Sequence, residues 1–171
     1  MNLVFPSIAT KENVFKIVEK HLEELGLIII KKDMERPWGG FFVIDEDQSK
    51  LFIEKFFSEV NEFSLIAENK LSPKILIVEP AKRSSWQYHF RRSEVWRIIG
   101  GEVKIVTSET DEEKNIKNYR QGSIIELKKG ERHRLIGLSG WGIVAEIWQH
   151  TDKNNPSNEE DIIRIQDDFG R

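Results

Sequence analysis

The stretch that decides the fold of this chain is Trp86-Gln87-Tyr88-His89-Phe90-Arg91-Arg92-Ser93-Glu94-Val95-Trp96-Arg97-Ile98-Ile99-Gly100-Gly101. Gln87 and His89 are two residues apart, so on a strand their side chains leave the same face. Arg92-Ser93 suits a short turn, and residues 94–99 alternate as a return strand that the two glycines end. The pattern predicts a β-hairpin that brings Glu94 back beside His89.

His133 adds another side chain of metal-binding type several predicted strands later. Together with Gln87, His89 and Glu94 it offers an amide oxygen, two imidazoles and a carboxylate, which suit zinc or another first-row metal. The set closes only if the sheet curls into a barrel. A histidine with a glutamate five residues later is also typical of a surface pair, so spacing alone leaves both interpretations open.

The rest of the second half also alternates as short strands separated by turns. Strands are predicted at residues 74–79, 86–91, 94–99, 102–107, 123–127, 132–136 and 142–149. Residues 108–118 are predicted to form a charged, solvent-facing loop. Many short strands with turn signals between them are typical of a jelly roll or barrel, so we expect a mainly β fold.

The first third of the chain differs because it carries a helical pattern. Thr10 suits the N-cap of a helix that runs to about Leu25, whose apolar residues recur at spacings of three and four and form one stripe. Gly26 is a typical helix stop. We expect this helix to pack on the outside of the barrel. A homodimer contact through it is the less favoured alternative.

The remaining elements of this third are expected at residues 27–31 (strand), 40–44 (strand) and 47–57 (helix). Residues 61–74 give no clear pattern. These predictions divide the chain into an N-terminal helix and strand extension, residues 1–35, and one β domain with its C-terminal tail packed on it, residues 36–171.

Composition is typical of a small soluble protein. The 171 residues are 39% hydrophobic and 32% charged, and 26 basic against 29 acidic residues give a formal net charge of −3. This balance argues against a nucleic-acid partner, which favours a basic face. The chain has no cysteine, which excludes disulfides and thiolate metal ligands. No signal-peptide pattern and no bilayer-spanning apolar run are visible, so we expect a cytoplasmic protein with no membrane partner.

Four segments, in this order along the chain, resemble one known family. Residues 80–101, with Gln87-x-His89 followed by Glu94, resemble the first cupin motif, and residues 122–133 resemble the second. Arg36-Pro37-Trp38-Gly39-Gly40 resembles the RPWG start of the cupin-type mannose-6-phosphate isomerases. Residues 161–171 resemble the DIVR-x-x-D-x-Y-G-R ending of the same family.

The resemblance implies a single cupin domain, a jelly-roll β-barrel, that binds one divalent metal ion, with zinc as the first choice. The metal ligands it implies are Gln87, His89, Glu94 and His133. The implied reaction is metal-dependent aldose–ketose isomerisation of a sugar phosphate, the interconversion of mannose-6-phosphate and fructose-6-phosphate. Arg91 stands where the usual motif has a second histidine, and Lys128 stands where a proline is expected. A non-catalytic or differently catalytic cupin that binds a sugar derivative is therefore the alternative.

A sugar phosphate needs cationic side chains and a base. Arginine forks suit phosphate best, and the predicted substrate-binding residues are Arg91, Arg134 and Arg164. Arg91 is expected to face the same side as Gln87 and His89, where it either binds a phosphate or sugar hydroxyl or pairs with Glu94 and weakens metal binding. A surface ion pair is the simpler alternative for each arginine. Glu146, on the last predicted barrel strand, is the predicted catalytic base.

The C-terminal segment after the polar linker 151–160 is expected to be ordered and folded back on the barrel. It carries more apolar residues than a disordered tail needs, namely Ile162, Ile163, Ile165 and Phe169. In an extended segment Arg164 points away from Ile163 and Ile165, toward the mouth of the site. An ion pair of Arg164 with Asp167 or Asp168 is the alternative.

Overall fold

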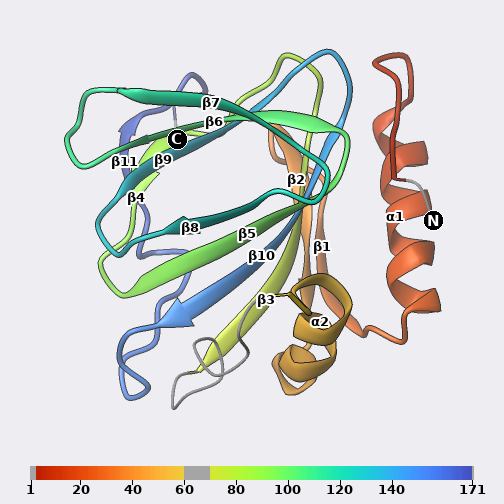
Figure 1. Cartoon of the computed structure of the whole chain (residues 1–171), viewed down its shortest axis with the longest axis horizontal. Coiled ribbons are helices and arrows are strands. Elements are labelled where there is room, and N and C mark those ends of the chain that lie inside the picture. The colour runs from red at the N-terminus through yellow and green to blue at the C-terminus, as the bar shows by residue number, and fades with distance from the viewer. Residues whose placement is uncertain (1–2, 60–69, 171) are drawn as a thin grey trace.

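The structure is a computed structural model that describes residues 3–59 and 70–170. Two antiparallel sheets form its body, with helix α1 alongside (Figure 1). The elements in chain order are α1 (Lys11–Glu24), β1 (Ile29–Asp33), β2 (Gly39–Ile44), the 3-10 helix η1 (Glu46–Gln48), α2 (Ser49–Phe56), β3 (Leu71–Val78), β4 (Trp86–Tyr88), β5 (Arg92–Gly100), β6 (Glu102–Ser108), β7 (Asn115–Arg120), β8 (Ile124–Leu127), β9 (Arg132–Gly137), β10 (Gly142–His150) and β11 (Ile163–Gln166). The predicted mainly β fold with an N-terminal helix is confirmed.

Strand order defines the two layers. The first sheet runs β1-β2-β3-β10-β5-β8, and the second runs β11-β4-β9-β6-β7. Apolar side chains from both sheets share one core, for example Trp96 and Val144 from the first sheet with Ile105 and Leu135 from the second. The two sheets therefore face each other, as in the jelly roll that the turn spacing predicted.

Strand β10 shows how one sheet serves two cores. Its alternate residues Ile143, Ala145 and Ile147 belong to a second core, which lies on the other face of the first sheet. Val144 joins the core between the sheets. A strand that is covered on both faces needs a nearly continuous run of apolar residues. Glu146 interrupts this run on β10, and a buried carboxyl group needs polar partners.

Helix α1 covers the outer face of the first sheet. The Thr10 side chain accepts a hydrogen bond from the backbone N–H of Asn13, which caps the helix as predicted. The buried stripe includes Phe15, whose ring centroid lies 5.3 Å from that of Phe42 on β2. Each fully buried side chain of this size contributes about 1.5–3 kcal/mol, so packing on the sheet is enough to hold the helix.

Three local predictions are wrong. The segment 86–99 is not a hairpin, because β4 and β5 pair with different sheets and the chain crosses between the sheets at residues 89–91. Residues 115–118 of the predicted loop belong to β7, an edge strand that pairs with β6. Ile163 and Ile165 are 39% and 36% exposed, so they do not bury the apolar surface expected of them.

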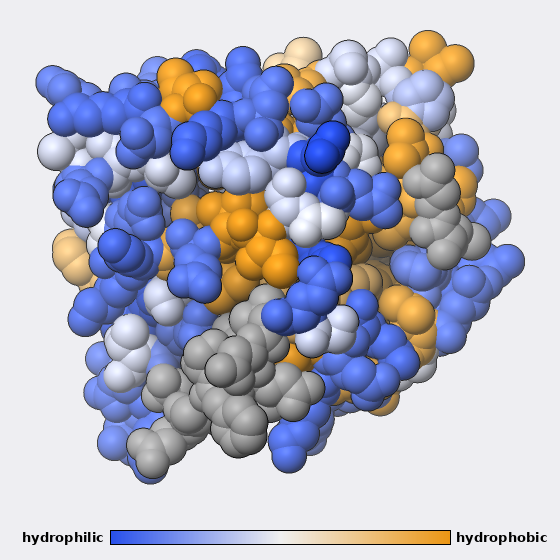
Figure 2. All heavy atoms as spheres, viewed as in Figure 1, coloured by the Kyte–Doolittle hydropathy of each residue, from blue (hydrophilic) through white to orange (hydrophobic). Residues whose placement is uncertain are grey.

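The predicted course of the C-terminal segment agrees with the structure. The C-terminal segment does fold back, because β11 pairs with β4. Much of the unassigned stretch 61–74 lies outside the described residues, although β3 begins at Leu71. Figure 2 shows polar side chains over most of one face, with apolar ones gathered near its centre. No helix within residues 3–59 and 70–170 is both long and apolar enough to cross a membrane.

Candidate functional site

Three of the predicted metal ligands meet between the two sheets. His89 follows β4 and His133 lies on β9 of the same sheet, whereas Glu94 projects from β5 of the facing sheet. One ligand atom of each lies within 4.8 Å of the others, and all three side chains are buried. The crossing of the chain between the sheets therefore achieves what the predicted hairpin was expected to do. Metal binding by these residues stays a prediction.

Hydrogen bonds fix the orientation of both imidazoles. His89 Nδ1 lies 2.8 Å from the carbonyl oxygen of Asp161, and His133 Nδ1 lies 3.0 Å from that of Glu131. A carbonyl only accepts, so each Nδ1 carries the proton and each Nε2 keeps its lone pair. The two Nε2 atoms lie 3.3 and 3.6 Å from the Glu94 carboxylate oxygens. Such backbone support of the second ring nitrogen is what metal-binding histidines need.

The atom that most favours a metal is His133 Nε2. It is buried and has no hydrogen-bond partner among the described residues. A buried acceptor without a partner costs free energy, and a cation held by His89, Glu94 and His133 would satisfy it. The donor set therefore fits a divalent ion of the zinc type.

Gln87, the fourth predicted ligand, lies beside the cluster. Its Cα is the register partner of His133 on the neighbouring strand. Its Oε1 accepts a hydrogen bond from Ser85 Oγ at 2.6 Å, and an amide oxygen has a second lone pair to offer. Gln87 as a ligand stays a prediction.

Arg92 is a site residue that the sequence did not predict. Its side chain is buried, its Nε donates to Glu94 Oε1 at 2.7 Å, and its Nη2 lies 3.0 Å from His89 Nε2. The pKa of His89 is lowered to about 3, chiefly by burial and also by the charge of Arg92, against the opposing effect of Glu94. Burial raises the pKa of Glu94, but the charge and hydrogen bond of Arg92, together with the two histidines, outweigh this and keep the pKa below its ordinary value. Glu94 is therefore ionised and His89 neutral at pH 7, as metal ligands must be.

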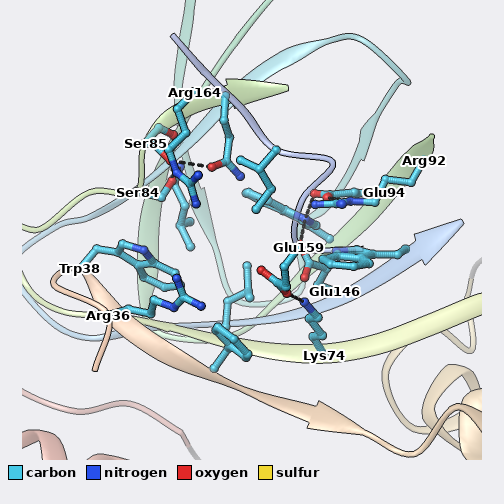
Figure 3. A pocket seen from close by; sticks show the side chains of 17 residues that line it. Arg36, Trp38, Lys74, Ser84, Ser85, Arg92, Glu94, Glu146, Glu159 and Arg164 are labelled. Carbon is cyan, nitrogen blue, oxygen red and sulfur yellow. Dashed lines mark hydrogen bonds and ion pairs between the residues drawn. The ribbon is translucent and has the colours of Figure 1, made fainter. Parts of the chain in front are cut away.

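A pocket next to this cluster is rich in charged side chains (Figure 3). Its cations are Arg36, Lys74, Arg92 and Arg164, and its carboxylates are Glu94, Glu146 and Glu159. In Figure 3, Arg36 and Arg164 lie on one side of the pocket, and Lys74, Glu146 and Glu159 lie on the other. Opposite charges in one hollow suit a ligand that carries both an anionic group and hydroxyls.

Glu146 shares a hydrogen-bond donor with Glu94. The indole Nε1 of Trp96 lies 3.0 Å from Glu94 Oε2 and 3.0 Å from Glu146 Oε1. Burial raises the pKa of Glu146 well above its ordinary value, and the negative charge of Glu94 raises it further. The pKa values of two neighbouring carboxyl groups are thus shifted in opposite directions, which is a common arrangement in acid–base sites.

Glu159 is paired with Lys74 at the same pocket. The Lys74 Nζ atom lies 2.5 Å from Glu159 Oε1 and 3.5 Å from the ring centroid of Trp148. Burial raises the pKa of Glu159, but Lys74 outweighs this and lowers it below its ordinary value. Glu159 is therefore ionised at pH 7, whereas the pKa of the neighbouring Glu146 is raised.

The three predicted substrate arginines have different positions. Arg164 lines the pocket, on β11 and in register with Gln87 of β4. Arg91 does not line it and donates to Asn155 Oδ1 at 2.8 Å and to Asn158 Oδ1, so the prediction that it faces the Gln87 side is wrong. Arg134 is fully buried outside the pocket and donates to Glu113 at 2.6 Å.

Sequence reasoning missed four charged pocket residues: Arg36, Lys74, Arg92 and Glu159. Arg36 belongs to the Arg36-Pro37-Trp38-Gly39-Gly40 motif, which is a sequence signal for it. Arg92 was assigned to a turn, although β5 begins at that residue. Lys74 and Glu159 are 85 residues apart, so no local pattern connects them.

The facing sheets with this cluster between them define the class of protein: the chain has the cupin fold. A solved structure with a similar fold is the oxalate decarboxylase of Lactobacillus farciminis in its formate complex, with a TM-score of 0.53 and 18% identity over 78% of this chain and 33% of that one. At this identity the likeness concerns the fold alone.

The family follows from the sequence comparison. Residues 55–167 match the model of the family "Mannose-6-phosphate isomerase C-terminal", and this chain belongs to that family. It is 27% identical to a mannose-1-phosphate guanylyltransferase of Salmonella montevideo over 94% of this chain. It is 26% identical to a putative mannose-1-phosphate guanylyltransferase of Vibrio cholerae serotype O1 over 91% of this chain. The chain spans only 28% of the length of each of these relatives.

Proposed function

We propose that this chain is a metal-dependent aldose–ketose isomerase that interconverts mannose-6-phosphate and fructose-6-phosphate. The observation that carries the proposal is the cluster of His89, Glu94 and His133, with both Nε2 atoms turned toward one carboxylate beside a charged pocket. The family assignment supports it, and the names of both curated relatives also refer to a mannose phosphate.

The proposed metal ligands are His89, Glu94, His133 and Gln87, and zinc is the proposed ion. When bound, such an ion supplies electrostatic stabilisation for the negative charge that develops on the sugar oxygens during isomerisation. The protein's own part is to orient the two imidazoles and to keep His89 neutral. The carbonyls of Asp161 and Glu131 support this role.

Proton transfer between adjacent sugar carbons requires a group that both gives and takes a proton. We propose Glu146 for this role because its pKa is raised toward neutral pH. A group whose pKa lies near the working pH gives and takes a proton efficiently. Glu159 lies in the same pocket and is ionised, so it is the second candidate. Comparing Glu146→Gln with Glu159→Gln distinguishes them, because only the variant of the proton carrier should lose most of kcat.

The phosphate is proposed to bind Arg164, with Arg36 on the same side of the pocket. Arg91 and Arg134 already have protein acceptors outside the pocket, which makes them weaker candidates than the sequence suggested. A cupin that binds a sugar derivative without this catalysis is the second candidate function, because Arg92 engages two of the proposed metal ligands.

The cytoplasmic location and the homodimer that the sequence suggested both stay predictions.

The test of this function is an assay of mannose-6-phosphate and fructose-6-phosphate interconversion by the zinc-loaded protein. We expect turnover that a chelator abolishes and added metal restores. Arg164→Ala should raise KM for the sugar phosphate by about tenfold or more, since it removes a charge-assisted hydrogen bond to phosphate. Arg120→Ala, a matched change on exposed β7, should leave KM unchanged. Absence of turnover with zinc and with other first-row metals would contradict the proposed reaction.

A further inference from the structure

The guanidinium of Arg92 lies inside the proposed ligand cluster. It contacts Glu94 Oε1 through Nε at 2.7 Å and His89 Nε2 through Nη2 at 3.0 Å. The side chain is 2% exposed, so these contacts are shielded from water. A positive charge that belongs to the protein thus engages two of the groups that a metal ion would bind.

Arg92 is also held from its other side. Its Nη1 donates to Ser157 Oγ at 2.7 Å and to the carbonyl oxygen of Asn158 at 3.3 Å. The guanidinium carbon lies 3.5 Å from the ring centroid of Trp148, in stacking position. Several contacts therefore hold Arg92 in place, and moving it out of the cluster costs free energy.

His89 can serve only one of the two cations. Because its Nδ1 donates to the Asp161 carbonyl, the ring has a single lone pair, on Nε2. That lone pair either accepts the Arg92 N–H or binds a metal. Glu94 is less restricted, since a carboxylate has enough lone pairs for both a metal and the Arg92 Nε–H.

We propose that Arg92 is an internal cation that competes with the metal for His89 and Glu94 and thereby sets the metal affinity of the site. The proposal rests on the proposed function, since it requires a metal at this cluster. In the metal-free protein Arg92 neutralises Glu94. When a metal binds, Arg92 gives up His89 and keeps its contacts with Glu94 and the segment at Ser157.

The competition connects the metal site to the C-terminal segment. Ser157 Oγ, which accepts from Arg92, donates to Asp161 Oδ2 at 2.7 Å. The carbonyl of the same Asp161 orients His89. The segment 157–161 therefore supports both competitors for the metal site, Arg92 and His89.

The experiment measures affinity, not activity. Chelator-stripped protein is titrated calorimetrically with Zn²⁺ alone. Arg92→Met keeps the length and the contact with Trp148 but removes the charge and the donors, and it should bind Zn²⁺ at least about tenfold more tightly than the wild type. Arg120→Met is the matched control, because Arg120 is exposed on β7 and lies outside the pocket, and its affinity should equal that of the wild type.

Arg92→Lys keeps the charge but not the fork that bridges two ligands, so it should bind with an intermediate affinity; it also serves if Arg92→Met does not fold. If Arg92 only supports the fold, its removal should leave the zinc affinity unchanged or weaken it. When the wild type binds zinc, this result overturns the proposed competition by Arg92 but leaves the proposed function standing. If neither the wild type nor the folded Arg92 variants bind Zn²⁺, the metal site fails, and the proposed function fails with it.

Discussion

At the scale of single residues, two backbone carbonyls decide how the histidines of the site are oriented. The carbonyl of Glu131 lies two residues before His133, whereas that of Asp161 comes from the C-terminal segment, 72 residues from His89. The first support is local and the second is tertiary. The sequence could suggest His89, Glu94 and His133 as a set, but it could not show which ring nitrogen of each faces inward.

Sequence patterns also could not show which of two arginines lies beside the proposed metal ligands. Arg91 and Arg92 are adjacent, and the choice between them depends on where β5 begins. The chain leaves one sheet at Tyr88 and joins the other at Arg92, so the two arginines point to different sides. A one-residue error in a strand boundary moves a side chain to the opposite face.

Acid should destabilise the metal-free protein through His89. The pKa of His89 is about 3 in the folded state, below its ordinary value near 6.5, so between these pH values the unfolded chain holds a proton that the folded protein lacks. Stability is therefore lost as pH falls below about 6.5, by at most roughly 1.4 kcal/mol per pH unit from this residue. Urea unfolding at pH 7, 6 and 5 measures the slope. His89→Gln should show a smaller slope than the wild type, and equal slopes would contradict the assignment.

At the scale of elements, the turn before β2 depends on one glycine. Gly39 has φ of +143°, and a Cβ there would lie 1.9 Å from the carbonyl oxygen of Ile77 on β3. The Arg36-Pro37-Trp38-Gly39 stretch therefore needs glycine for close strand approach, and the same turn places Arg36 and Trp38 at the pocket.

Gly39→Ala should destabilise the protein by at least about 2 kcal/mol, because β2 and β3 must separate or twist to admit the methyl group. Chemical unfolding measures the change. Gly122→Ala is the control: Gly122 also has a positive φ, +92°, but no atom lies within 4 Å of the added Cβ. It should cost only about 1 kcal/mol of backbone strain. Equal losses in both variants would show that the close approach to Ile77 is unimportant.

The elements that sequence patterns predicted well are those with a buried face. Helix α1 was predicted to within a residue at each end because its stripe is buried and its cap is local. β7 was missed because its six residues, Asn115–Arg120, are almost entirely exposed and polar. An edge strand of this kind is held by its partner β6, which no local pattern records.

At the scale of the whole molecule, the two-sided burial of the first sheet links the helices to the site. Ile143, Ala145 and Ile147 of β10 pack toward the helices, while Glu146 and Trp148 of the same strand line the pocket. The helices therefore hold the strand that carries the proposed catalytic carboxyl group. The sequence predicted the layers, but the cluster and the pocket required the three-dimensional crossing of the chain between sheets.

The most direct test of the central claim is the number of zinc ions bound per chain, measured by titration of the metal-free protein. The wild type is predicted to bind one Zn²⁺ per chain. His133→Ala is predicted to bind none with comparable affinity while keeping the wild-type circular dichroism spectrum, since His133 supplies one ligand and lies on a strand held by two neighbours. Retention of one tightly bound zinc in folded His133→Ala, or no zinc in the wild type, would contradict the account.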